Sequence, residues 1–145
     1  MKQDIICTVS LEINAPKSRV WDALVNPEKI AKYFFGTQAI SDWKVGSSLI
    51  FRGEWEGKPY EDKGTILQME KEKIFKYDYW SNFSGQPDLP ENYQTITYAL
   101  KEEGVNTIFT VTQENCKTEE AREHSEKNWN MLLGSMKKML ETGEI

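Results

Sequence analysis

Residues 118–142 read TEEAREHSEKNWNMLLGSMKKMLET, and this stretch predicts one long amphipathic helix. Thr118 is a typical capping residue, and Glu119 and Glu120 suit the positive end of a helix dipole. Gly143 would end the helix. Apolar residues recur at helical spacing and would form one side of this helix: Ala121, Trp129, Leu132, Leu133, Met136, Met139 and Leu140. A helix of about 25 residues is far longer than the average in globular proteins.

Upstream of this helix, positions 38–113 consist of short segments rich in β-branched and aromatic residues. Turn residues such as Val45-Gly46 and Glu103-Gly104 separate the segments. The pattern predicts an antiparallel meander with strands at 38–41, 47–55, 58–70, 74–80, 94–101 and 106–114. Segment 81–92 contains Gly85, Pro87 and Pro90 and is expected to be a loop that forms a mobile rim.

The first part of the chain predicts a strand followed by two short helices. Apolar residues alternate with polar ones from Ile5 to Ile13, which is the pattern of a half-buried strand. Pro16 suits the first turn of a helix whose apolar positions include Val20, Trp21 and Leu24. Asn26-Pro27 ends this helix, and a second short one is expected at about 28–34.

This order of elements resembles the helix-grip fold of the START and pollen-allergen superfamily, also called SRPBCC. Ile13-Asn14-Ala15-Pro16, Val20-Trp21-Asp22-Ala23-Leu24 and Asn26-Pro27-Glu28 resemble the opening of the branch related to activators of the heat-shock-protein-90 ATPase. His124 followed by Trp129, and Asp42-Trp43-Lys44-Val45-Gly46, are similar to later motifs of that branch. The resemblance implies one α+β domain over residues 1–145, with a curved antiparallel sheet of about seven strands wrapped round the last helix.

Composition excludes several classes of function. A net charge of -5 and a pI near 5.0 argue against a nucleic-acid partner. No apolar run is long enough to cross a membrane and no signal peptide is present, so a cytoplasmic protein is expected. Cys7 and Cys116 have no metal-ligand spacing, and neither a metal nor a cofactor is predicted. His124, the only histidine, lies in a charged stretch and is expected to be solvated, so no catalytic residue is predicted.

The chain carries five Trp, six Tyr and six Phe, which demand a large interior. The predicted fold leaves space between sheet and helix that side chains must either fill or line. Candidate ligand-binding residues are Phe51, Trp55, Trp80, Tyr98, Phe109, Trp129, Leu133 and Met136. The alternative is that these residues simply pack the core, and the hydroxyls of Tyr77, Tyr79 and Tyr98 could point either inward or to solvent.

A charged series surrounds one predicted hairpin and consists of Arg52, Glu54, Glu56, Glu61, Asp62 and Lys63. It is expected to form cross-strand ion pairs on an exposed face. A member that turned inward would instead imply a polar ligand group or a catalytic acid.

Three functions fit the sequence. The favoured one is non-enzymatic binding of a small hydrophobic ligand, such as a lipid, a polyketide or a flavonoid-like aromatic, in a cavity between the sheet and the last helix. The resemblance also implies a chaperone-associated module with a possible chaperone partner. A cyclase-like or hydratase-like enzyme is the second alternative, and no residue set singles it out.

Overall fold

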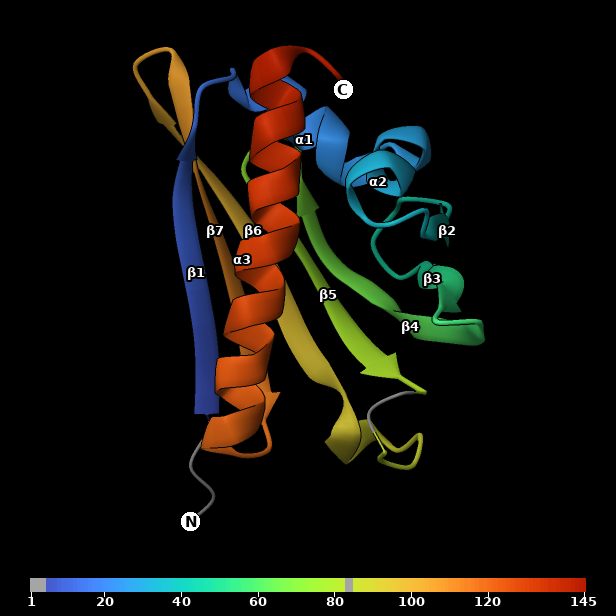
Figure 1. Cartoon of the computed structure of the whole chain (residues 1–145). Helices are drawn as coiled ribbons and strands as arrows, with labels where there is room; N and C mark the ends of the chain where they lie inside the picture. Colours follow the sequence, from blue (N-terminus) through green and yellow to red (C-terminus); the bar gives the residue numbers. More distant parts are fainter. Residues whose placement is uncertain (1–4, 83–84) are drawn as a thin grey trace.

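The computed structural model describes residues 5–82 and 85–145, apart from the side chain of Trp55, and shows a curved sheet with one long helix along it (Figure 1). The elements in chain order are β1 (Ile5–Ile13), α1 (Lys17–Val25), α2 (Pro27–Tyr33), β2 (Gln38–Ser41), β3 (Ser48–Trp55), β4 (Lys58–Glu70), β5 (Ile74–Ser81), a 3-10 turn (Pro90–Asn92), β6 (Gln94–Glu103), β7 (Asn106–Cys116) and α3 (Glu119–Thr142). This order confirms the helix-grip prediction.

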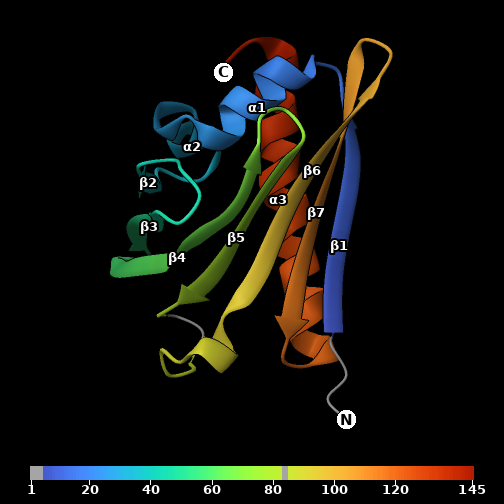
Figure 2. The same cartoon turned by 180° about the vertical axis from the view of Figure 1, so that it is seen from behind.

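The seven strands form one antiparallel sheet in the order β1-β7-β6-β5-β4-β3-β2. Helix α3 lies along the concave face in front of β1, β7 and β6, and α1 and α2 cover the end near the C-terminus (Figure 1). Seen from behind, the convex face of the sheet lies in front of α3 (Figure 2). The core is therefore the layer between the sheet and the three helices.

Helix α3 has the limits that its sequence predicts. The Thr118 hydroxyl accepts a hydrogen bond from the Ala121 amide at 3.0 Å, which satisfies one of the free N–H groups of the first turn. Gly143 ends the helix in the left-handed conformation, with a φ of 80°. The helix buries Leu132, Leu133, Met136 and Leu140, which form the stripe that faces the sheet.

The two short helices are joined by a single residue. Asn26 ends α1, and its side-chain oxygen accepts a hydrogen bond from the Glu28 amide at 3.1 Å at the start of α2. The Tyr33 hydroxyl then donates to the Ala23 carbonyl at 2.9 Å and ties the end of α2 back to α1. This compact pair covers one end of the sheet.

Strands β4 and β5 approach each other closely at Gly64. A Cβ atom on Gly64 would lie 1.7 Å from the Asp78 carbonyl oxygen, so only glycine fits at this position. A register shift between Ile66 and Gln68 follows on the same strand pair. Gly64 is also paired with Leu49 on β3, and the pairing of β4 with β3 ends at Thr65, just before the bulge.

The predicted strands are confirmed, with small extensions at their ends. Strand β5 continues to Ser81, β6 to Glu103 and β7 to Cys116. Beyond Ser81, the described part of the predicted loop 81–92 contains one regular element, the 3-10 turn at Pro90–Asn92. The predicted rim also includes positions 83–84, which lie outside the described residues.

Candidate functional site

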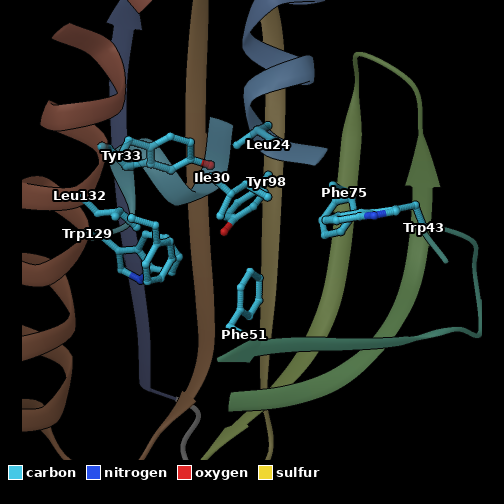
Figure 3. Close-up of a pocket in the computed structure, with 11 residues that line it drawn as sticks. Leu24, Ile30, Tyr33, Trp43, Phe51, Phe75, Tyr98, Trp129 and Leu132 are labelled. Atoms are coloured by element: carbon cyan, nitrogen blue, oxygen red, sulfur yellow. The ribbon is translucent and has the colours of Figure 1, made fainter. Parts of the chain in front are cut away.

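An aromatic-lined space lies between α3 and the sheet, where the sequence predicts a cavity (Figure 3). Its volume is about 10 Å³, which is room for a single water molecule. The residues around it are Leu24, Ile30, Tyr33, Phe34, Trp43, Phe51, Phe75, Tyr98, Trp129, Leu132 and Leu133. Four members of the predicted ligand-binding set, Phe51, Tyr98, Trp129 and Leu133, are therefore brought together here.

Ring packing explains why this inner space is small. Tyr98 stacks on Phe75 with centroids 5.9 Å apart and meets Trp129 edge to face at 6.0 Å. Phe34, from the end of α2, stacks on Phe51 at 5.8 Å. Figure 3 shows the Trp129 ring reaching inward from the helix and the Phe51 and Tyr98 rings reaching inward from the sheet. Side chains thus fill most of the predicted cavity.

A much larger hollow lies at the other end of the helix, beside its first turns. This groove has a volume of about 490 Å³, which is within the usual range of ligand sites. Its lining residues are Tyr79, Trp80, Ser81, Gln86, Asn92, Gln94, Gln113, Lys117, Ala121, His124 and Ser125. The groove thus lies between the ends of β5, β6 and β7 and the N-terminal half of α3.

The predicted site residues separate into three groups. Trp80 lines the groove, whereas Phe51, Tyr98, Trp129 and Leu133 surround the inner space. Phe109 and Met136 are fully buried and line neither hollow. For these two residues the packing alternative describes their place in the core. The side chain of Trp55 lies outside the described residues.

A chain of hydrogen bonds connects the inner space to the groove. The Trp129 indole N–H donates to the side-chain oxygen of Gln113 at 2.7 Å, and the Gln113 amide donates to Gln94 at 2.8 Å. Trp129 borders the inner space, whereas both glutamines line the groove. The two hollows are therefore neighbours, because the Trp129–Gln113 hydrogen bond links a residue that borders one to a residue that lines the other.

A buried carboxyl group lies close to the groove. Asp62 on β4 is 8% exposed, and its Oδ2 atom accepts a hydrogen bond from the Tyr79 hydroxyl at 2.9 Å. Burial raises the pKa of Asp62, and hydrogen bonds from the Ser81 and Tyr79 hydroxyls oppose that shift. Burial and the nearby Asp62 carboxyl also raise the pKa of Tyr79. Tyr79 therefore stays protonated and donates to the carboxyl.

The tyrosine hydroxyls, whose direction the sequence left open, point inward. Tyr77 and Tyr98 are buried, and their hydroxyl oxygens are 2.9 Å apart. Burial raises the pKa of Tyr98 to about 12, while a hydrogen bond from Tyr77 opposes the shift. Both hydroxyls thus remain neutral and satisfy each other in the core.

The charged series around the hairpin behaves as expected only in part. Arg52 and Glu61 form the predicted cross-strand ion pair at 2.7 Å, and Lys63 pairs with Asp88 in the following loop at 2.5 Å. The exposed-face expectation is wrong for Asp62. Asp62 has the same phase along β4 as the fully buried Ile66, so alternation directs it to the concave face.

His124 is exposed on α3, as expected, yet it also lines the groove. Gln94, Gln113 and Asp62 were not in the predicted site. Strand phase could have found Gln113, because it continues the inward row of Phe109 and Val111 on β7. Within the described residues no group of three or more potential metal ligands exists, and no helix there is long and apolar enough to span a membrane.

The sheet, the gripping helix and the hollows between them define a helix-grip protein. A family model described as "Activator of Hsp90 ATPase homolog 1-like protein" matches residues 14–141. The chain belongs to this family, as its motifs suggest. No curated protein matches the chain.

Solved structures share this fold. The protein ChR145 from Cytophaga hutchinsonii is 48% identical, with 99% of this chain and 98% of that chain covered and a TM-score of 0.86. An Aha1 dimer from Colwellia psychrerythraea is 18% identical over 97% of this chain and 99% of its own, with a TM-score of 0.76. CalU16 from Micromonospora echinospora is 17% identical over 95% and 83%, with a TM-score of 0.75. The last two show similarity of fold alone.

Proposed function

We propose that this protein is a non-enzymatic binding module that holds a small, mostly apolar aromatic molecule in the groove beside α3. The observation that carries the proposal is a groove of about 490 Å³ next to the aromatic core. Gln113 of the groove is hydrogen-bonded to Trp129 of that core. Ligand sites of proteins combine such a volume with apolar walls and a few polar groups that fix orientation. Tyr79, Trp80 and Ala121 supply the apolar surface of this groove, and its other lining residues, among them Gln94 and Gln113, supply polar groups.

The groove wall is held in place before any ligand binds. The Trp80 indole N–H donates to the Gln86 carbonyl at 3.2 Å, and the Lys63 ammonium lies 5.6 Å from the centre of the Trp80 ring. A fixed ring loses little conformational entropy when a ligand stacks against it. The wall is therefore pre-organised for a flat apolar molecule.

A ligand can gain further contact area if Trp129 moves. Rotation of its ring breaks the hydrogen bond to Gln113 and joins the groove to the inner space. One such bond contributes only about 0.5–1.5 kcal/mol, whereas micromolar binding corresponds to about 8 kcal/mol. We infer that Trp129 is the movable part of the wall.

A groove-filling variant tests the proposal. Ala121 lines the groove, so Ala121→Phe should occupy it, whereas Met131→Phe on the exposed side of the same helix should not. With a panel of apolar aromatics, wild type and Met131→Phe should show altered tryptophan emission and a raised melting temperature. Ala121→Phe should respond at least about tenfold more weakly. No response of the wild type to any compound would refute the proposal.

A chaperone-associated role is the second candidate, and the description of the family supports it. Glu119 and Glu120 are exposed in the first turn of α3 and could meet a basic patch on a partner. Reversal of both charges should abolish recovery of a specific chaperone from cell extract. If wild type and variant recover none, this role fails.

The proposal includes a cytoplasmic location, which the cysteines support. Cys7 and Cys116 are both buried and free, and unpaired thiols are typical of reducing compartments. Cell fractionation checks this point, and recovery in a secreted fraction would contradict it.

A further inference from the structure

Asp62 lies on the concave face at the boundary between the two hollows. In the strand register it is opposite Phe51 on β3 and Ser81 on β5. Phe51 borders the inner space, and Ser81 lines the groove. Tyr79, the hydrogen-bond donor to Asp62, is also a groove residue. The carboxyl is thus separated from the groove by the side chains that hold it.

The two oxygens of this carboxyl are not equivalent. Oδ2 accepts from Tyr79, whereas Oδ1 is buried and has no hydrogen-bond partner among the residues that the structure describes. A buried polar atom without a partner is costly and rare in folded proteins. Oδ1 therefore lacks a donor among the described residues, and the groove, which Tyr79 and Ser81 line, is the larger hollow beside this carboxyl.

Other ionisable groups around Asp62 are engaged elsewhere. On its own strand, the Tyr60 hydroxyl is hydrogen-bonded to Thr37, and Glu61 and Lys63 pair with Arg52 and Asp88. On β5 and β6, Tyr77 and Tyr98 bond to each other. Tyr79 is the titratable side chain that directly holds the carboxyl.

We propose that Asp62 and Tyr79 form the polar anchor of the ligand site and select apolar aromatic molecules that carry a hydroxyl group. The inference deepens the proposed function and rests on it. Tyr79 fixes the carboxyl through Oδ2, and the ligand hydroxyl donates to Oδ1. The ligand hydroxyl approaches past Ser81, the cross-strand neighbour of Asp62, whose own hydroxyl also hydrogen-bonds to the carboxyl. A phenol therefore binds more tightly than the same ring without a donor.

Protonation should control this preference. The charged carboxylate accepts a strong hydrogen bond from a phenol. When Oδ1 carries a proton, it becomes a hydrogen-bond donor and no longer accepts from the phenol in this way. Because burial raises the pKa of Asp62, the protonated form persists to higher pH than for an exposed aspartate. Hydroxyl preference should therefore be full above that pKa and fall as the pH is lowered through it.

The test compares 2-naphthol with 2-methoxynaphthalene, which has the same rings but no donor. Calorimetry on the wild type should give an affinity for the naphthol higher by about tenfold or more, as expected for a hydrogen bond to a charged group. Asp62→Asn keeps the shape of the side chain and should bind both probes about equally. Glu61→Gln, on the opposite face of the same strand, should keep the wild-type preference.

The outcomes separate the two proposals. If the wild type binds both probes equally, the anchor is refuted and the groove remains a binding site. If Asp62→Asn retains the full preference for the naphthol, Asp62 is not the anchor. If neither probe binds, the proposed function fails and the anchor with it. Should Asp62→Asn not fold, the wild-type pH profile decides, because a preference that does not change with pH refutes the anchor.

Discussion

Two buried polar side chains shape the site at the scale of single residues. Gln113 is 7% exposed and connects the Trp129 indole to Gln94, so its two hydrogen bonds set the position of Trp129 in the absence of a ligand. Asp62 is equally buried and is held by hydrogen bonds from the Ser81 and Tyr79 hydroxyls. Burial of an amide whose polar atoms are hydrogen-bonded costs little free energy, whereas burial of a carboxyl with one oxygen lacking a partner destabilises the fold. The two residues therefore differ in what they contribute to stability.

Trp129→Phe separates the ring from its hydrogen bond. The phenyl ring keeps much of the contact with Tyr98 but cannot donate to Gln113. The free energy of unfolding should fall by about 1–2 kcal/mol, as measured by urea denaturation. Ligand affinity should also change, because the side chain at position 129 is no longer hydrogen-bonded to Gln113 between the two hollows. Trp21→Phe is the control, since Trp21 is a buried residue of α1 and lines neither hollow. Equal changes in affinity at both positions would show that Trp129 is only a packing residue.

The contribution of Asp62 to stability should fall as the pH rises. Its pKa in the folded protein lies above the ordinary value of 3.8, so the native state holds the proton more tightly than the unfolded chain does. The contribution is therefore full below pH 3.8 and is lost as the pH rises through the folded-state pKa. The unfolding free energy of the wild type relative to Asp62→Asn should decline across that window.

Asp88→Asn provides a control of opposite sign. The Lys63 ammonium and the Tyr93 hydroxyl hold the pKa of Asp88 below 3.8, so its contribution is present above that pH and is lost on acidification. If both aspartates give the same trend in urea denaturation, burial of Asp62 is not the cause of its effect.

At the scale of elements, the local signals in the sequence predict the fold well. Alternation in β1, the turn residues between strands, and Thr118 and Gly143 at the ends of α3 are all local features. The site depends on contacts between distant segments, such as Phe34 on Phe51 and Tyr98 on Trp129, which no local pattern contains. The predicted cavity was therefore in the right place but is largely filled, and the larger groove was indicated only by Trp80.

Two glycines in regular elements should respond to the same substitution in opposite ways. Gly64→Ala would push a Cβ into the Asp78 carbonyl and separate β4 from β5, so a loss of more than about 3 kcal/mol is expected. Gly134→Ala on α3 meets no atom within 4 Å and should add about 0.5–1 kcal/mol through helix propensity. Thermal and urea unfolding measure both. A mild effect of Gly64→Ala would contradict the close approach of the two strands.

For the whole molecule, the two ends of α3 have different tasks. Its C-terminal half buries Leu132, Leu133, Met136 and Leu140 against the sheet and holds the fold together. Its N-terminal half borders the groove with Ala121, His124 and Ser125 and leaves room for a ligand. One element thus provides both the stability of the core and the wall of the proposed site.

A nitrogen–proton correlation NMR titration of the wild-type protein with 2-naphthol tests most directly whether the groove beside α3 binds an aromatic ligand. The indole signals of Trp80 and Trp129 and the backbone amides of Gln94, Gln113 and Ser125 should shift together and saturate. The Trp21 indole and the amide of Val105, at the far turn, should not move. An absence of shifts at saturating probe, or shifts confined to exposed apolar residues such as Phe35 and Val45, would contradict a ligand site in the groove.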